Sequence, residues 1–425
     1  MKNNSQVRFG IGILGLLMTV ACASQPGATV APIPDPGFTS TSAPSRTAIP
    51  STTTTTMPSA TPSPLPSLRA TIIPSPSAYK IVGYLAGWNV DGKRNYRIAD
   101  IPADKVTHLN YAFADVSPDG LCVTDDPRGD SANFAELQKL KQRYPQLKTL
   151  ISLGGADGSK YFPVAAKAAD SRKQFVASCV RFMQDNGFDG IDIDWEFPSN
   201  ADEKQNYTAM LSEFRAQLGA KNLLTIAAPA GPEDYTGVAW SAIARDLDWI
   251  NLMTYDFAGS WSSMTNFDAP LYASSTESSK GKNAKTYNDN STVLAYIAAG
   301  VPANKILLGV PFYGRGWKGV ADTNHGLYQK FDGVPNGTAG DGAFDYRDIQ
   351  QNYLSTYTRY WSDEAQVPWL YNPSTQIMIS YDDPESIGIK ADYAHAKKLG
   401  GVMIWEISTD DDQHSLLNAI VARLK

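Results

Sequence analysis

Cysteine and histidine are scarce in this 425-residue chain, which has three Cys and four His. The cysteines are too few and too scattered for a disulfide framework, and none has the C-x-x-C spacing of a zinc site. The histidines share no ligand spacing either. We therefore do not expect a zinc site, and we predict no bound cofactor. The residues concerned are Cys22, Cys122, Cys179, His108, His325, His395 and His414.

Clusters of basic residues are also missing, and the formal net charge is −6. The acidic excess lies entirely after residue 78, because the preceding segment has one acid, Asp35, and four bases, Lys2, Arg8, Arg46 and Arg69. A protein that binds a polyanion needs a basic surface to neutralise phosphates. Nucleic acid is therefore not an expected partner.

The N-terminal apolar run, residues 9–21, is too short to span a bilayer comfortably. It follows Lys2 and Arg8 and ends at Cys22, a pattern typical of an export signal. The small residues before Cys22 resemble a bacterial lipoprotein signal, in which that cysteine is lipidated. Ala21-Cys22-Ala23 also fits an ordinary A-x-A cleavage site. We predict a lipoprotein-type signal over 1–22 and an extracytoplasmic protein, lipid-anchored at Cys22 or secreted.

Tryptophan and tyrosine are absent before Tyr79, and charged residues are rare there. Residues 25–78 contain 12 of the 27 prolines and 20 serines and threonines. Such a segment cannot bury enough apolar surface to offset the entropy lost on ordering. We predict a disordered linker over 23–78 and a folded catalytic domain over 79–425.

Short apolar runs alternate with helical patterns from Tyr79 onward, a spacing that suits βα units. Eight such strands in about 350 residues indicate an α/β fold, a (β/α)8 TIM barrel. A long Gly-, Tyr- and Asp-rich stretch, about 318–380, predicts a small inserted α+β subdomain between strands seven and eight. The predicted strands are 80–85, 107–112, 149–153, 190–194, 223–228, 249–254, 306–310 and 401–405, and the helices include 134–143, 171–186, 201–218 and 392–399.

The fourth predicted strand has acids at alternate positions, Asp192, Asp194 and Glu196. Side chains alternate between the two faces of a strand, so the acids share one face, about 6.7 Å apart at each step. The apolar residues between them would pack on the surrounding helices. The acids then point into the barrel and rise towards its C-terminal mouth, where barrel enzymes place catalytic groups.

Two carboxylates at this spacing repel by about 2.5 kcal/mol in an effective dielectric near 20. The row should therefore share a proton, with the outermost acid, Glu196, kept protonated as a general acid requires. Two other interpretations stay open at this point. One is a row of solvated acids on an exposed strand, and the other is a Ca²⁺ or Mg²⁺ site.

The sequence D-G-x-D-x-D-x-E over residues 189–196 resembles the signature of glycoside hydrolase family 18, the chitinases and related endo-N-acetylglucosaminidases. The resemblance extends from Tyr79 to the C-terminus. Other matching segments are Ser152-Leu153-Gly154-Gly155, Met253-Thr254-Tyr255-Asp256, Asp268-Ala269-Pro270-Leu271-Tyr272, residues 309–315, Ser380-Tyr381-Asp382-Asp383 and Trp405.

The resemblance implies a retaining, substrate-assisted hydrolysis in which the N-acetyl carbonyl of the substrate is the nucleophile. Glu196 would protonate the glycosidic oxygen and later activate water. Asp194 would orient the acetamido N–H and stabilise the oxazolinium ion, while Asp192 shares the proton. Tyr255 would donate a hydrogen bond to the acetamido oxygen.

Further roles are implied around the sugar site. Tyr84 and Ser152 match positions that hydrogen-bond the innermost acid, and Asp256 and Arg315 match contacts to sugar hydroxyls. Trp405 matches the floor of the site, and sugar C–H faces favour further aromatic platforms. Candidates for these platforms are Trp88, Phe113, Trp261 and Trp317.

One position departs from the pattern of many chitinases. Ala156 follows the S-x-G-G segment, where an aromatic residue is frequent, so we expect a weaker platform on the leaving-group side.

The implied substrate is chitin or a related N-acetylglucosamine polymer, cleaved by a monomer. Peptidoglycan or a protein-linked glycan is an alternative substrate. A glycan-binding lectin on an inactive scaffold is a non-enzymatic alternative, against which the intact Glu196, Asp194 and Tyr255 argue.

Overall fold

The computed structural model describes residues 79–90, 94, 96–275, 285–338 and 340–425. The predicted signal over 1–22, the lipidation of Cys22 and the linker over 23–78 therefore lie outside the described residues. Within the described ranges, no helix is long and apolar enough to cross a membrane.

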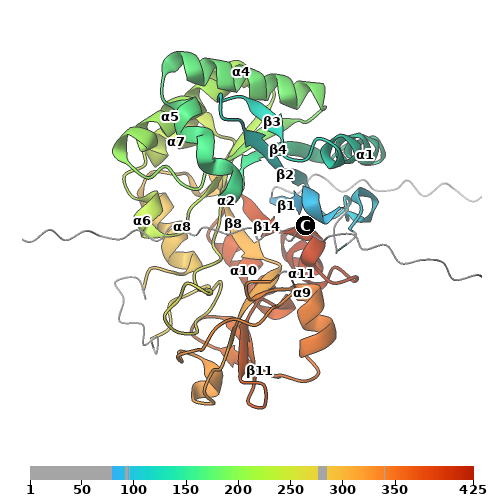
Figure 1. The fold of residues 1–425 in the computed structure, drawn as a ribbon, viewed down its shortest axis with the longest axis vertical. Helices are drawn as coiled ribbons and strands as arrows, with labels where there is room; N and C mark the ends of the chain where they lie inside the picture. Colours follow the sequence, from blue (N-terminus) through green and yellow to red (C-terminus); the bar gives the residue numbers. More distant parts are fainter. Residues whose placement is uncertain (1–78, 91–93, 95, 276–284, 339) are drawn as a thin grey trace, which may run out of the picture. The chain divides into compact units, whose positions relative to one another are not determined.

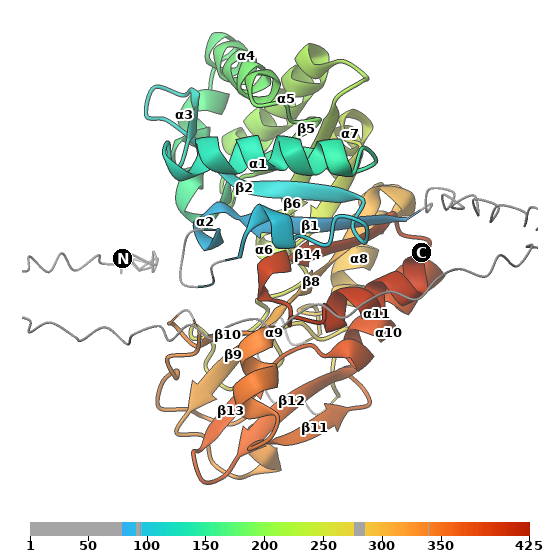
Figure 2. The same cartoon turned by 90° about the vertical axis from the view of Figure 1, so that its right-hand side faces the viewer.

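Eight parallel strands form a closed barrel, as predicted (Figures 1 and 2). β1 is hydrogen-bonded to β14 on one side and to β2 on the other, which closes the sheet. All eight predicted strands exist, with ends that differ by a few residues at most. They are β1 (Lys80–Ala86), β2 (His108–Val116), β4 (Lys148–Gly154), β5 (Gly190–Asp194), β6 (Leu223–Ala228), β7 (Trp249–Leu252), β8 (Ile306–Pro311) and β14 (Gly401–Trp405).

Helices surround the barrel and bury their apolar faces against it. In α4 the buried residues Phe175, Val176, Cys179 and Met183 recur on one face with helical spacing. The longer helices are α1 (Gly129–Arg143), α4 (Ala169–Asp185), α5 (Ala201–Leu218), α7 (Trp240–Asp246), α8 (Asp289–Ala298), α10 (Pro384–Ala396) and α11 (Ser415–Leu424). Short ones are α2 (Gly155–Gly158), α3 (Phe162–Ala166), α6 (Pro232–Tyr235) and α9 (Tyr346–Asp348).

α10 begins well before the predicted helix 392–399. Its start is determined by Asp383, whose side chain accepts the N–H groups of Glu385 and Ser386, and by Pro384 at the first helical position. These capping residues outweigh the weak periodicity of the first turns.

A five-stranded antiparallel sheet is inserted between β8 and β14, in the order β10-β9-β13-β12-β11. It begins at Tyr313, slightly before the predicted insertion 318–380, and it has its own core around Trp317, Trp369 and Tyr371. Its strands are β9 (Tyr313–Lys318), β10 (Ala343–Asp345), β11 (Thr358–Ser362), β12 (Val367–Asn372) and β13 (Ile377–Ser380), whereas β3 (Cys122–Thr124) adds to the edge of β2.

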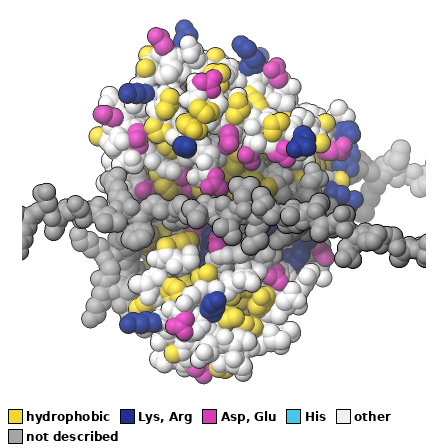
Figure 3. All heavy atoms as spheres, viewed as in Figure 1, with side chains coloured by type: hydrophobic (Ala, Val, Ile, Leu, Met, Phe, Trp, Pro, Cys, Tyr) yellow, Lys and Arg dark blue, Asp and Glu magenta, His cyan; other side chains and the backbone are white. Residues whose placement is uncertain are grey.

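Acidic and basic side chains are interspersed over the upper part of the face seen in Figure 3, with apolar side chains between them. This mixture fits the absence of basic clusters from the sequence. Cys122 and Cys179 are free thiols, and Cys179 is buried.

Candidate active site

The three acids lie at the C-terminal end of β5. Asp192 is fully buried and Asp194 is nearly so, with 3% of its surface exposed. The alternate residues Ile191 and Ile193 belong to the core under the helices, and Trp195 stacks on Phe162 with ring centroids 5.3 Å apart. The strand therefore presents its acids to the barrel interior, as its alternation predicts.

Asp192 accepts hydrogen bonds from side chains of four other barrel strands. Tyr84 Oη donates at 2.6 Å and Ser152 Oγ at 2.8 Å. Thr225 Oγ1 and Asn251 Nδ2 also donate, the latter at 3.2 Å. Burial raises the pKa of Asp192, and these hydrogen bonds oppose that rise. Asp192 is thus held rigidly in a dry environment.

Thr225 and Asn251 were not recognised as site residues from the sequence. The available signal was a single polar residue within each apolar strand, at a position that alternation places inside the barrel. Ser152, which was predicted, is fully buried and contacts Asp192. It does not line the cleft that opens above the acids, so its role is to hold Asp192.

Asp194 lies between the other two acids along the strand. Burial raises its pKa well above the usual range, and the charges of Glu196 and Asp192 raise it further. Its Oδ1 has no hydrogen-bond partner among the described residues. Asp194 also contributes to the lining of the cleft above the acids, so its carboxyl group can meet a bound ligand.

Glu196 has a pKa raised to about 7, which suits a general acid near neutral pH. Burial is the largest cause, followed by the charges of Asp256, Asp157 and Asp234. The alternate spacing of the three acids predicts mutual repulsion along the row. That repulsion is present and raises the pKa of Asp194, whereas the charges that raise the pKa of Glu196 come from acids on three other segments.

Ser159 holds the backbone around the acids and was also missed. Its Oγ accepts the N–H of Glu196 at 2.8 Å and lies 2.7 Å from Gly155 O and 3.1 Å from Asp194 O. Ser159 follows α2, the turn after β4, so no local pattern in the sequence connects it with β5.

The S-x-G-G segment permits a close approach of β4 to β5. Gly154 has φ +106°, and a Cβ there would lie 2.3 Å from Asp194 O. Gly155 has φ +76°, and a Cβ would lie 2.6 Å from the Phe113 ring. Glycine is required at both positions because backbone or ring atoms occupy the space of a side chain.

Asp256 and Arg315 form a bidentate ion pair with two N–O distances of 2.8 Å. The Arg315 guanidinium also lies over the rings of Trp261 and Tyr313, at 5.3 and 5.2 Å. Tyr255 lies nearby, with its ring centroid 6.2 Å from that of Tyr313. The structure thus brings together the predicted residues Tyr255, Asp256 and Arg315.

A cleft of about 990 Å³ opens above the acids. Trp88, Phe113, Trp261 and Trp405 line it together with Glu196 and Tyr255. Trp88 and Trp261 are each about half exposed, 53% and 52%, which suits platforms for sugar rings. Ala156 also lines the cleft.

The suggestion that Trp317 is a further platform is wrong. Its ring is fully buried in the core of the inserted sheet, and its Nε1 donates to Gly259 O at 3.0 Å. A tryptophan that alternates into a sheet core offers no face to a ligand.

The solvated-strand interpretation of the acids does not fit their burial. Across the parts of the chain that the structure describes, no group of three or more His, Cys, Asp or Glu side chains could hold a metal ion. The raised pKa of Glu196 allows this side chain to deliver a proton. Asp194 can accept hydrogen bonds in the same aromatic-lined cleft.

Comparisons with known proteins agree on one family. The model of the glycosyl hydrolases family 18 matches residues 80–410. Chitinase A1 of Niallia circulans is 40% identical over 411 residues, covering 82% of this chain and 58% of that protein. Chitinase 1 of Aphanocladium album is 39% identical, covering 76% of this chain and 80% of that protein. The solved structure of chitinase ChiA74 from Bacillus thuringiensis has a TM-score of 0.75 at 35% identity, covering 82% of this chain and 70% of that one.

Proposed function

The chain belongs to glycosyl hydrolase family 18, and we propose that it is a chitinase that hydrolyses β-1,4-linked N-acetylglucosamine polymers with retention of configuration. One observation supports this activity above the others. Glu196, with its pKa near 7, lies in an aromatic-lined cleft directly beyond two buried aspartates on the same strand.

Glu196 protonates the glycosidic oxygen as the bond to the anomeric carbon breaks. The acetamido oxygen of the same sugar attacks that carbon, so the intermediate is an oxazolinium ion of the substrate itself. The resulting Glu196 carboxylate then takes a proton from water, which opens the intermediate. A single side chain acts first as acid and then as base.

Asp194 supports this chemistry through its unpartnered oxygen, which accepts the acetamido N–H and faces the positive charge that develops in the oxazolinium ring. Asp192 is fixed by its four donors and maintains the electrostatic environment of Asp194. Tyr255, with its hydroxyl near Met403 Sδ at 4.0 Å, donates to the acetamido oxygen.

The substitution Glu196→Gln tests this assignment. It removes the transferable proton but keeps the size and polarity of the side chain. We expect cleavage of chitooligosaccharides to fall by about 10³-fold or more, while binding measured by calorimetry remains. Turnover close to wild type would refute the role of Glu196.

Product analysis tests the substrate and the stereochemistry. The purified protein is incubated with chitin oligomers and, in parallel, with peptidoglycan, and the anomers are followed by NMR. Early β-anomeric products from chitin oligomers support the proposal. Cleavage of peptidoglycan alone would favour the alternative substrate, and binding without cleavage of either would favour a lectin.

We further propose that the protein acts outside the cytoplasm as a monomer, attached to a membrane through lipidated Cys22. The motif at the N-terminus supports the anchor, and the variant Cys22→Ala tests it. The variant should lose the lipid mass and leave the membrane fraction, and light scattering should report one chain per particle.

A further inference from the structure

Three aromatic side chains form a row along the cleft. The Phe113 ring lies between Trp88, at 6.0 Å and 32°, and Trp405, at 5.9 Å and 22°. Trp88 follows β1 in the turn η1 (Gly87–Asn89), and Trp405 ends β14. The spacing of the two tryptophans therefore depends on how these two segments are joined.

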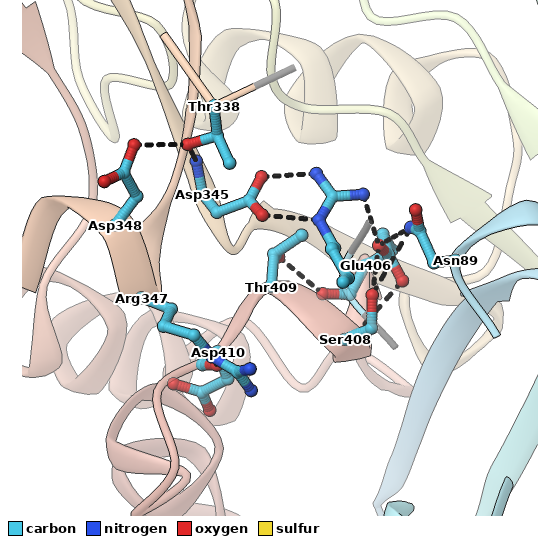
Figure 4. A network of polar contacts seen from close by, with 10 residues as sticks. Asn89, Thr338, Asp345, Arg347, Asp348, Glu406, Ser408, Thr409 and Asp410 are labelled. Atoms are coloured by element: carbon cyan, nitrogen blue, oxygen red, sulfur yellow. Dashed lines mark hydrogen bonds and ion pairs between the residues drawn. The ribbon is translucent and has the colours of Figure 1, made fainter. Parts of the chain in front are cut away.

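A buried hydrogen bond joins the residues that directly follow the two tryptophans. Asn89 Nδ2 donates to Glu406 Oε1 at 2.6 Å, and the two residues are 5% and 4% exposed. Ser408 Oγ also donates to Glu406 Oε1 at 2.6 Å, and Ser408 N donates to Oε2 at 3.2 Å. Figure 4 shows Asn89 and Ser408 directed at the Glu406 carboxylate. Each tryptophan is thus one peptide bond away from this connection.

Arg94 extends the connection to the inserted sheet. Its Nη1 lies 3.6 Å from Glu406 Oε1, and its other edge forms a bidentate pair with Asp345 at the end of β10. Asp345 is itself 6% exposed, and its N–H donates to Thr338 Oγ1 at 3.1 Å. The Arg94 guanidinium therefore bridges a barrel carboxylate and a carboxylate of the insertion.

The Glu406 carboxylate is buried, and burying it costs the free energy of its hydration. This cost indicates that the side chain has a role beyond packing. A buried carboxylate loses its hydration and is retained only where charges and donors compensate. Glu406 obtains that compensation from Asn89 and Arg94, both in the connection that follows β1, and from Ser408 in its own turn. Loss of one partner would leave a buried charge that moves to find water, and the attached Trp405 would move with it.

We propose that Glu406 and Arg94 are positioning residues that set the spacing of Trp88 and Trp405 and hold this aromatic row against the inserted sheet. The inference rests on the proposed function, because it assumes that the row binds sugar rings. Its consequence is length dependence. A long oligosaccharide that contacts the whole row should depend on this network more than a short one.

The test compares Glu406→Gln, Arg94→Gln and Asp345→Asn with the control Arg97→Gln. Arg97 lies in the same loop and pairs with Asp100, but its side chain is 69% exposed. Combined with Glu196→Gln, the three network variants should bind chitohexaose about tenfold more weakly, and chitobiose less than about twofold more weakly. In the active enzyme, KM for chitohexaose should rise about tenfold with kcat nearly unchanged.

Equal losses of affinity for chitohexaose and chitobiose would overturn the inference, and so would no loss for either. A merely structural role would lower thermal stability without any dependence on the length of the ligand. If Glu406→Gln does not fold, Asp345→Asn tests the same bridge and leaves Glu406 in place. Near-ultraviolet circular dichroism reports the packing of the row without any sugar. An unchanged spectrum in every network variant overturns the inference, even if the protein binds no chitooligosaccharide and the proposed function fails separately.

Discussion

Glu196 owes its raised pKa to burial and to acids on other segments, and Asp256 is the largest of the charged contributors. In Asp256→Asn the negative charge is lost, so the protonated form of Glu196 is less favoured and its pKa falls. The alkaline limb of kcat/KM, expected near pH 7 in the wild type, should move to lower pH by about half a pH unit.

The control for this shift is Asp363→Asn, an exposed acid in the turn between β11 and β12. Its profile should coincide with that of the wild type. An alkaline limb that stays in place in Asp256→Asn would contradict the electrostatic contribution of Asp256.

Buried threonines in the barrel allow a second prediction. Thr225→Val removes a donor to the buried Asp192 and keeps the side-chain shape, so the free energy of unfolding should fall by about 1–3 kcal/mol and kcat should fall as well. Thr149 is a matched control, because it is equally buried but its Oγ1 has no hydrogen-bond partner among the described residues. Thr149→Val should be neutral or stabilising in chemical denaturation. Equal effects of the two substitutions would argue against the special role of the Asp192 contacts.

At the scale of elements, the junction of β4 with β5 is the tightest contact of the site. Gly154→Ala places a methyl group within 2.3 Å of Asp194 O at a φ of +106°. Either the strand or the catalytic acid must move, so we expect the free energy of unfolding to fall by more than about 2 kcal/mol and activity to be nearly lost.

Gly219 is the control that separates the effect of backbone strain from the effect of a steric clash. It also has a positive φ, +67°, but nothing lies within 4 Å of an added Cβ. Gly219→Ala should cost about 1 kcal/mol and leave kcat/KM intact. Denaturation and kinetics of both variants provide the comparison, and an active Gly154→Ala enzyme would show that β4 can withdraw without harm.

The same scale explains which elements could be predicted. Barrel strands such as residues 190–194 and 223–228 are recognisable because a short apolar run between turn signals has few alternatives. The start of α10 was missed because capping by Asp383, and not periodicity, determines it. β9 begins before the predicted insertion, because only one residue, Phe312, separates it from β8. No turn signal in the sequence marks this boundary.

At the scale of the whole molecule, the net charge of −6 and the interspersed charges in Figure 3 allow a prediction about ionic strength. A neutral polysaccharide is not steered by the charge of the protein, so kcat/KM should change less than about twofold between roughly 10 and 150 mM salt. A steep fall with salt would indicate a charged substrate, such as an anionic cell-wall polymer.

The sequence by itself determined the family, the barrel and the acids on β5, because strand alternation and a dense local motif are properties of consecutive residues. Only the tertiary structure decided the environment of those acids. Thr225 and Asn251 donate to Asp192, and Ser159 accepts the N–H of Glu196, each from a different segment. Trp317 lies in the core of the inserted sheet. Burial and hydrogen bonding depend on contacts between residues that are far apart in the sequence, and no local pattern specifies those contacts.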